Sequence, residues 1–147
     1  MNNSMVESFY GHEDIDKFIR NTYFPDYSYT GTVVEVGAAT PEYLSMSLHF
    51  KLNKWRTIVV EPNPTFSEMH RKMESEVYEV ACSNQNQDDV EFTIVHANSG
   101  KVTDHSFSSL SIKESYRQIG KNWVERLDKT TIKVNVRTLD YIIKTQK

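Results

Sequence analysis

Two short apolar runs, each followed by an acid, constrain this chain more than any other feature. Val33-Val34 lead into Glu35, and Ile58-Val59-Val60 lead into Glu61. The stretch between them has room for one turn and one helix, so residues 31–64 predict a strand–helix–strand unit. The carboxyl ends of neighbouring parallel strands line one crevice, where nucleotide-like ligands bind. We therefore expect a site for an adenosine-containing cofactor beside these two acids.

Length and charge narrow the class of protein. The 147 residues fit a single domain, 1–147, that can bury a core. The net charge of −3, without a long run of one sign, predicts no nucleic-acid partner, because such partners need a basic face. A single cysteine and the lack of an apolar core for a signal peptide in residues 1–16 indicate a cytoplasmic protein. No apolar run approaches the ~20 residues that span a bilayer, so we expect no membrane partner.

Apolar residues at helical spacing predict several helices. They cover residues 14–23, the segment from Glu42 onward and residues 65–73, and Thr138 is placed to cap another over 139–143. The apolar faces of the first three comprise Ile15, Phe18, Ile19 and Tyr23, then Tyr43, Leu44, Leu48 and Leu52, then Phe66, Met69 and Met73. We expect these faces to pack inward.

Residues that favour strands alternate with the predicted helices. Residues 32–36 and 57–61 have the composition of fully buried strands, and 77–82, 90–95 and 132–136 predict three more. The segment 96–130 has only scattered apolar residues and one plausible helix, around 112–119. A stretch of that length is usually a functional loop, a lid or a disordered segment.

The predicted sheet looks unfinished at its carboxyl-terminal end. A helix in such a pattern normally leads into another parallel strand, but residues 139–147 leave no room for one. We therefore expect either the amino-terminal portion of a longer domain or a partner that supplies the missing strands. An open sheet edge invites pairing with another chain, so we also expect homo-oligomer formation.

Glu61 is the candidate ribose ligand. It follows Gly37 by 24 residues and ends the second strand, where a carboxylate can accept hydrogen bonds from both ribose hydroxyls. The small residues Gly37, Ala38 and Ala39 let the backbone approach a ligand closely. The turn lacks the Gly-x-Gly-x-x-Gly pattern that a dinucleotide pyrophosphate needs, which argues against NAD. It favours a cofactor without phosphates, such as S-adenosylmethionine.

Glu35 allows two interpretations. It can lie near the cationic methionyl end of that cofactor. It can equally accept hydrogen bonds from the backbone N–H groups of its own turn and have no ligand. The residue types alone do not separate the two.

Several short motifs now identify a family. In chain order they are Glu35-Val-Gly-Ala, Trp55-Arg56 before a strand, Val60-Glu-Pro-Asn-Pro64, Val80-Ala-Cys-Ser83, Val90-Glu-Phe92, Ser108-Ser-Leu110 and Val136-Arg-Thr-Leu-Asp140. Together they resemble the FkbM-type S-adenosylmethionine-dependent methyltransferases, over about residues 10–143. The resemblance implies an α/β, doubly wound, Rossmann-like class I methyltransferase fold. It also implies methylation of a hydroxyl group on a small molecule or sugar.

The resemblance assigns roles residue by residue. Glu35, Gly37 and Ala38 match the motif that holds the methionyl part, and Ala39 continues the turn where the family commonly has Asn or Asp. Glu61 matches the ribose-binding acid, and Pro62 and Asn63 follow it as in the family. Ala81 and Cys82 match the strand end that borders the adenine, and Ser109 matches a family serine near the active-site mouth. Tyr10-Gly11 and Glu13-Asp14 resemble an amino-terminal element that can fold over the cofactor.

No residue has a clear claim to be the general base, so the catalytic residues stay unassigned. The five histidines form no close ligand set, and we predict no metal site. Cys82, at the end of an apolar strand, is better explained as a small buried residue than as a nucleophile. The alternative to an enzyme is therefore a truncated or degenerate module that binds the cofactor without activity of its own.

Overall fold

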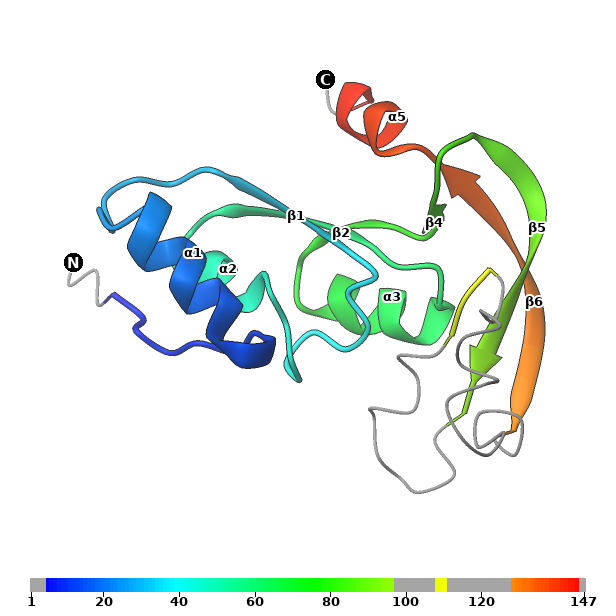
Figure 1. Cartoon of the computed structure of the whole chain (residues 1–147), viewed down its shortest axis with the longest axis horizontal. Helices are drawn as coiled ribbons and strands as arrows, with labels where there is room; N and C mark the ends of the chain where they lie inside the picture. Colours follow the sequence, from blue (N-terminus) through cyan, green and yellow to red (C-terminus); the bar gives the residue numbers. More distant parts are fainter. Residues whose placement is uncertain (1–4, 97–107, 111–127, 146–147) are drawn as a thin grey trace. The chain divides into compact units, whose positions relative to one another are not determined.

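The computed structural model describes residues 5–96, 108–110 and 128–145 and shows a mixed α/β chain (Figure 1). The chain forms two compact units, Met1–Tyr78 and Glu79–Lys147, which we call the N-terminal and C-terminal units. The predicted helix at 112–119 and most of the predicted loop at 96–130 lie outside the described residues.

A parallel three-stranded sheet forms the centre of the N-terminal unit. Its strands are β1 (Thr32–Val36), β2 (Arg56–Val60) and β3 (Glu76–Tyr78), in the order β1-β2-β3. Val34 lies opposite Ile58, and Ile58 opposite Glu76. The last four residues of β2 are all buried, as expected of a central parallel strand. The predicted strand–helix–strand unit with parallel strands is confirmed.

The helix after β2 forms where the sequence predicts it. α3 (Pro64–Lys72) has Asn63 as its N-cap, whose side chain accepts a hydrogen bond from Thr65 N, and proline at its first position. It contacts β2 and β3. Phe66 is buried as predicted, but Met69 is exposed, so its predicted inward position is wrong. The polar residues Ser67 and His70 are buried instead, because Ser67 donates to the carbonyl of Glu61 after β2 and His70 donates to that of Ala39 in the turn after β1.

The helix predicted from Glu42 onward is wrong in its first half. α2 covers only Leu48–Leu52, and Tyr43, Leu44 and Leu52 are exposed. Leu44 has a φ of 58°, which a right-handed helix cannot contain. The amides of Met46 and Ser47 also donate to the carboxylate of Glu35.

The first helix forms as predicted but buries a different face. α1 (Ile15–Tyr23) follows the short 3-10 helix η1 (His12–Asp14). Phe18 and Tyr23 are 60% and 65% exposed, whereas Asp16 and Arg20 are fully buried. The predicted inward packing of the apolar face is therefore wrong. One reason is that backbone amides of Tyr10 and Lys17 donate to the carboxylate of Asp16, which offsets the cost of its burial.

The C-terminal unit is built on a second sheet. Its strands are β4 (Ala81–Cys82), β5 (Gln87–Val95) and β6 (Lys129–Arg137), in the order β4-β6-β5. β5 and β6 are antiparallel, and β4 and β6 are parallel. The buried core consists of Ala81, Phe92, Ile94, Val134 and Val136. The strands predicted at 90–95 and 132–136 are thus confirmed within longer strands.

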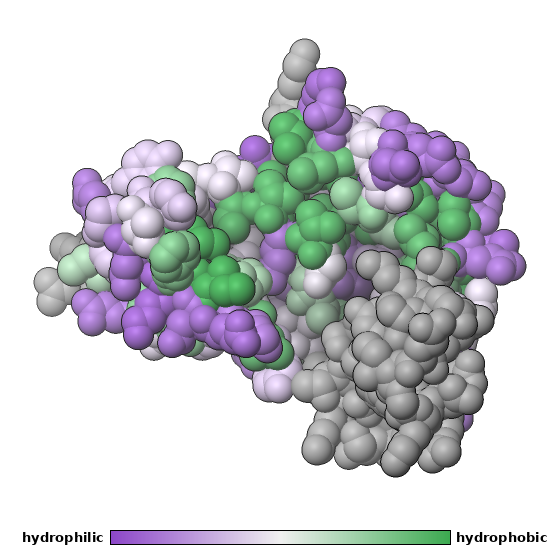
Figure 2. Space-filling model, viewed as in Figure 1, coloured by the Kyte–Doolittle hydropathy of each residue, from purple (hydrophilic) through white to green (hydrophobic). Residues whose placement is uncertain are grey.

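One predicted strand is divided between the two sheets. Residues 77–82 do not form a single strand, because β3 pairs with β2 whereas β4 pairs with Val136 and Arg137 of β6. The last predicted helix is confirmed as α5 (Leu139–Lys144), and Thr138 Oγ1 accepts the capping hydrogen bond from Tyr141 N. Figure 2 shows apolar residues at the surface of α5, where Ile143 is 52% exposed.

Candidate functional site

The carboxylate of Glu61 binds the turn that follows β1. Its Oε2 accepts a hydrogen bond from Ala39 N at 2.9 Å, and its Oε1 accepts one from Asn63 N at 2.8 Å. Glu61 is 5% exposed. The acid at the end of β2 and the turn after β1 are therefore held together at the carboxyl edge of two parallel strands, as the sequence predicts.

Burial is the largest influence on the pKa of this acid. Desolvation raises the pKa of Glu61, and the nearby charge of Glu35 adds a smaller increase. The two hydrogen bonds from Asn63 and Ala39 oppose this change. Each carboxylate oxygen has two lone pairs and accepts one backbone hydrogen bond here. One acceptor position on each oxygen thus remains for a hydroxyl donor.

Two residues of α3 support the same turn, and sequence reasoning missed both. His70 Nε2 donates to the carbonyl of Ala39 at 3.1 Å, and Ser67 Oγ donates to the carbonyl of Glu61 at 2.6 Å. Ala39 is thereby held through its N–H by Glu61 and through its C=O by His70. A signal was present in the sequence, because residues 63, 66, 67 and 70 share one helical face.

Gly37 leaves open space beside this turn. Its φ is 69°, which favours glycine, and its N–H donates to the carbonyl of Val60 at 2.8 Å. A Cβ atom built on Gly37 would meet no atom within 4 Å. Ala38, in contrast, is buried. A ligand can therefore approach the backbone at Gly37 closely, which fits a cofactor beside Glu61.

Glu35 has partners of another kind. Its Oε1 accepts from Met46 N at 2.8 Å, and its Oε2 accepts from Ser47 N at 3.1 Å. The hydroxyls of Ser45 and Ser47 also donate to Oε2. Ser45 Oγ in turn accepts from Leu48 N, the first residue of α2. Glu35 is thus bonded to backbone amides, but to those of Met46 and Ser47 before α2 and not to those of its own turn at residues 37–41, where the structural interpretation placed them.

A comparison with known families adds the decisive observation. The sequence model of the family described as "Methyltransferase FkbM domain" matches residues 35–147, which is more than half of the chain. The chain belongs to the FkbM methyltransferase family. The matched segment includes the Gly37 turn, Glu61 and the whole C-terminal unit. No curated protein and no solved structure matches the chain.

The remaining candidate residues of this FkbM chain divide between the units. Pro62 and Asn63 are buried beside Glu61 in the N-terminal unit. Ala81 is buried in β4 of the C-terminal unit, and Cys82 is half-buried next to it. The two residues make up all of β4, so the predicted adenine-bordering pair does not end a strand over residues 77–82, and it belongs to the other unit.

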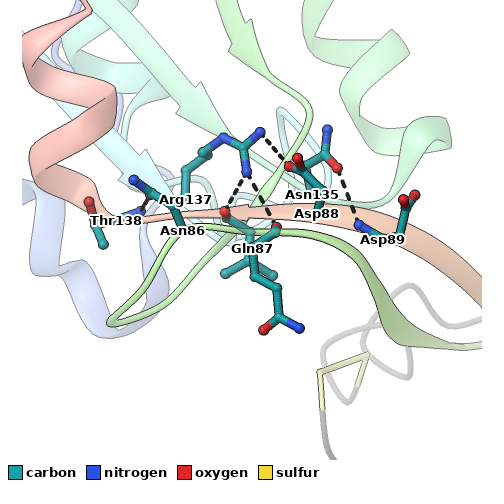
Figure 3. Close-up of polar contacts among 8 residues, drawn as sticks. Asn86, Gln87, Asp88, Asp89, Asn135, Arg137 and Thr138 are labelled. Carbon is teal, nitrogen blue, oxygen red and sulfur yellow. Dashed lines mark hydrogen bonds and ion pairs between the residues drawn. The ribbon is translucent and has the colours of Figure 1, made fainter.

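The FkbM motif at Arg137 forms a polar clasp in the C-terminal unit (Figure 3). Arg137 Nη2 donates to Asp88 Oδ1 at 2.7 Å, and Nη1 donates to the carbonyl of Gln87 at 3.3 Å. Thr138 N donates to Asn86 Oδ1 at 2.8 Å. A hollow of about 220 Å³ is lined by Asn86, Gln87, Asp88, Arg137 and Tyr141. The clasp ties the start of β5 to the end of β6, a structural role for this segment.

The family serine has a place in the second sheet. Ser109 exchanges backbone hydrogen bonds with Thr93 of β5, at 2.9 and 3.0 Å. The hydroxyl of Ser109 is buried without a hydrogen-bond partner.

Within residues 5–96, 108–110 and 128–145, no group of three or more His, Cys, Asp or Glu side chains is arranged to hold a metal ion. In the same residues, no helix has the length and apolar character to cross a membrane.

Proposed function

We propose that this FkbM-family chain is an S-adenosylmethionine-dependent methyltransferase with a doubly wound, Rossmann-like class I fold. The acceptor is a hydroxyl group on a small molecule or sugar. The observation that carries the proposal is the hydrogen bond from Ala39 N to Glu61 Oε2, at 2.9 Å. This hydrogen bond joins the acid to the turn at residues 37–39, at the carboxyl edge of β1 and β2, where cofactors bind in such sheets. The family match supports methyl transfer as the reaction.

The chain's own residues would hold the cofactor in distinct ways. Glu61 would accept hydrogen bonds from the ribose hydroxyls through its remaining lone pairs. Gly37 would let the backbone approach the ligand, because the space at its Cβ position is open. Ala81 and Cys82 would border the adenine, as the family resemblance implies. When bound, S-adenosylmethionine supplies an electrophilic methyl group on a sulfonium.

The proposal extends to the setting of the reaction. We propose a cytoplasmic enzyme that acts on small molecules and not on nucleic acid or membranes. The net charge of −3 supports this, because it provides no basic surface for polyanions.

A second candidate is a cofactor-binding module without activity of its own. The burial of Glu61 favours it, since an acid that is 5% exposed and already bonded to two backbone amides would hold a cofactor weakly. The sequence offers no residue with a clear claim to be the general base, which also favours a module.

Calorimetry with S-adenosylhomocysteine tests the site. We expect the wild type to bind it, and Glu61→Ala to bind at least about tenfold more weakly, because hydrogen bonds to a charged acceptor are lost. Glu68→Ala removes an exposed acid from α3 and should bind like the wild type. Gly37→Ala adds a Cβ atom in the open space without removing a hydrogen-bonding side chain, and should also weaken binding. Circular dichroism of each variant checks that it is folded.

The two candidates differ in turnover. Transfer of a labelled methyl group from S-adenosylmethionine to members of a sugar and small-alcohol panel would support the enzyme. Binding without transfer to any of them would support the module. If the folded wild type binds no S-adenosylhomocysteine, both are refuted.

A further inference from the structure

The N-terminal unit buries a cation that has no counter-ion among its described residues. Arg20, in α1, is 0% exposed. Its Nε, Nη1 and Nη2 atoms are all buried without a hydrogen-bond partner. A guanidinium group keeps its charge in proteins. Burial of an unpaired charge costs several kcal/mol, so the fold must compensate this one.

The nearest acids do not provide that compensation directly. Asp16 lies one turn earlier on α1, but its two oxygens accept from Tyr10 N at 2.7 Å and Lys17 N at 2.9 Å. Among the described residues, no carboxylate lies within 4.0 Å of the Arg20 nitrogens. Asp26 is at the surface, where hydrogen bonds from Ser28 lower its pKa and the more distant charge of Arg20 adds a smaller effect.

Aromatic side chains form the walls around the guanidinium. The Arg20 Cζ atom lies 3.9 Å from the ring centroid of Tyr27 and 5.8 Å from that of Trp55. The ring of His49 lies 6.0 Å from that of Tyr27. Contacts of a cation with aromatic faces contribute roughly 0.5–2 kcal/mol, less than the cost of burying the charge. The rings also provide no acceptor in the plane of the guanidinium.

Two of these side chains, Trp55 and His49, carry further buried polar atoms without hydrogen-bond partners. Trp55 Nε1, a donor, has no acceptor. His49 Nε2 also has no partner, whereas His49 Nδ1 lies 2.8 Å from the carbonyl of Ser8. A carbonyl only accepts, so Nδ1 carries the proton, and Nε2 of the neutral ring is an acceptor. Burial and, to a smaller extent, the charge of Arg20 lower the pKa of His49, so only a nearby anion would favour a second proton on Nε2 and turn that atom into a donor. Three side chains from α1, α2 and the approach to β2 therefore leave polar atoms unsatisfied in one aromatic cluster.

We propose that Arg20, His49 and Trp55 form a buried binding site for a small monocarboxylate anion. The planar fork of a guanidinium matches the two oxygens of a carboxylate. A singly charged, formate-sized or acetate-sized group suits a site whose Arg20 and His49 are both fully buried. Water would satisfy the donors but would leave the charge uncompensated. Arg20 precedes the segment that matches the family, whereas His49 and Trp55 lie within it. None of the three belongs to the proposed cofactor site, so this proposal does not rest on the proposed methyltransferase function.

Bound anion would join three separate parts of the N-terminal unit. Arg20 comes from α1, His49 from α2, and Trp55 directly precedes β2. A ligand that binds only the folded state stabilises it in proportion to the logarithm of its concentration over Kd. The anion should therefore raise the thermal stability of the chain in a saturable way.

The test is thermal unfolding of the full chain in sodium formate and in sodium gluconate at equal ionic strength. Gluconate carries the same carboxylate on a chain too bulky for an enclosed site. We expect a saturable rise in Tm with formate and none with gluconate. An equal response to both salts, as expected if only water fills the site, would overturn the proposal.

Three variants test whether the rise in Tm with formate depends on the proposed site. Arg20→Met keeps the length of the side chain and removes its charge and donors, so it should lose the formate response. Lys72→Met removes a cation from the exposed end of α3 and should respond like the wild type. Trp55→Phe keeps an aromatic ring at this buried position but removes the Nε1 donor together with part of the indole. It should bind formate at least about fivefold more weakly, as expected when a hydrogen bond to a charged group is lost. A rise in Tm with formate that persists in Arg20→Met refutes the site. If Arg20→Met does not fold, an unchanged affinity of Trp55→Phe for formate refutes it.

Discussion

Replacement of Glu35 by alanine tests whether this acid holds the fold. In the structure its carboxylate accepts hydrogen bonds from two backbone amides, Met46 N and Ser47 N, and from two serine hydroxyls. Alanine leaves both amides without a partner. A buried amide without a hydrogen bond costs about 1–3 kcal/mol, so two give about 2–6 kcal/mol. Met46 is only half-buried, which places the expected loss in the lower part of that range, at about 2–4 kcal/mol.

The measurement is the free energy of unfolding from urea titrations followed by circular dichroism. Glu42→Ala is the matched control, because Glu42 is an exposed acid in the same connection, and we expect it to stay within about 0.5 kcal/mol of the wild type. If Glu35 served mainly to bind a cofactor, Glu35→Ala would leave the stability of the ligand-free chain unchanged and lower only its affinity. Equal free energies for Glu35→Ala and Glu42→Ala would therefore refute the structural role.

Further predictions concern the turn, its histidine and the sheet edges. Burial lowers the pKa of His70 below its ordinary 6.5, although its hydrogen bond to Ala39 opposes this change. Below pH 6.5 the unfolded chain binds a proton at His70 that the folded chain does not bind, so the free energy of unfolding should fall as the pH drops, by up to about 1.4 kcal/mol per pH unit. In unfolding measurements His70→Asn should flatten this dependence on pH. Ala39 has a φ of 49°, so Ala39→Gly should raise the free energy of unfolding by about 0.5–1 kcal/mol, and a lower value would contradict the assigned backbone strain. The exposed ion pair between Arg56 and Glu76, at 2.8 Å, should contribute less than about 1 kcal/mol, as a double-mutant cycle would show. No described strand pairs with the outer edge of β1, so sedimentation velocity should show self-association, and a monomer at every concentration would argue against it.

Parts of the fold could be predicted because their signals are local. The apolar runs before Glu35 and Glu61 indicated two buried strands, and helical spacing in residues 65–73 predicted α3. Alternation in residues 132–136 and the cap at Thr138 likewise identified β6 and α5. In each case a few neighbouring residues carry both the signal and the interaction that it reflects.

Other features depended on partners that lie far along the chain. The helix expected from Glu42 onward is shortened because Glu35, in β1, accepts from the amides of Met46 and Ser47, which in a helix would donate to carbonyls four residues earlier. Residues 77–82 divide because β4 finds its partner in β6, more than fifty residues later. Helical periodicity also selected the wrong face of α1, since a carboxylate and a guanidinium occupy the interior there.

The sequence by itself thus determined the parallel β1–β2 pair with an acid at each carboxyl end, because apolar runs and turn residues act over short distances. Only the tertiary structure decided what those acids and the buried Arg20 contact. Burial of a polar group depends on whether a distant backbone or side chain supplies its hydrogen bonds, and that information is not contained in local spacing.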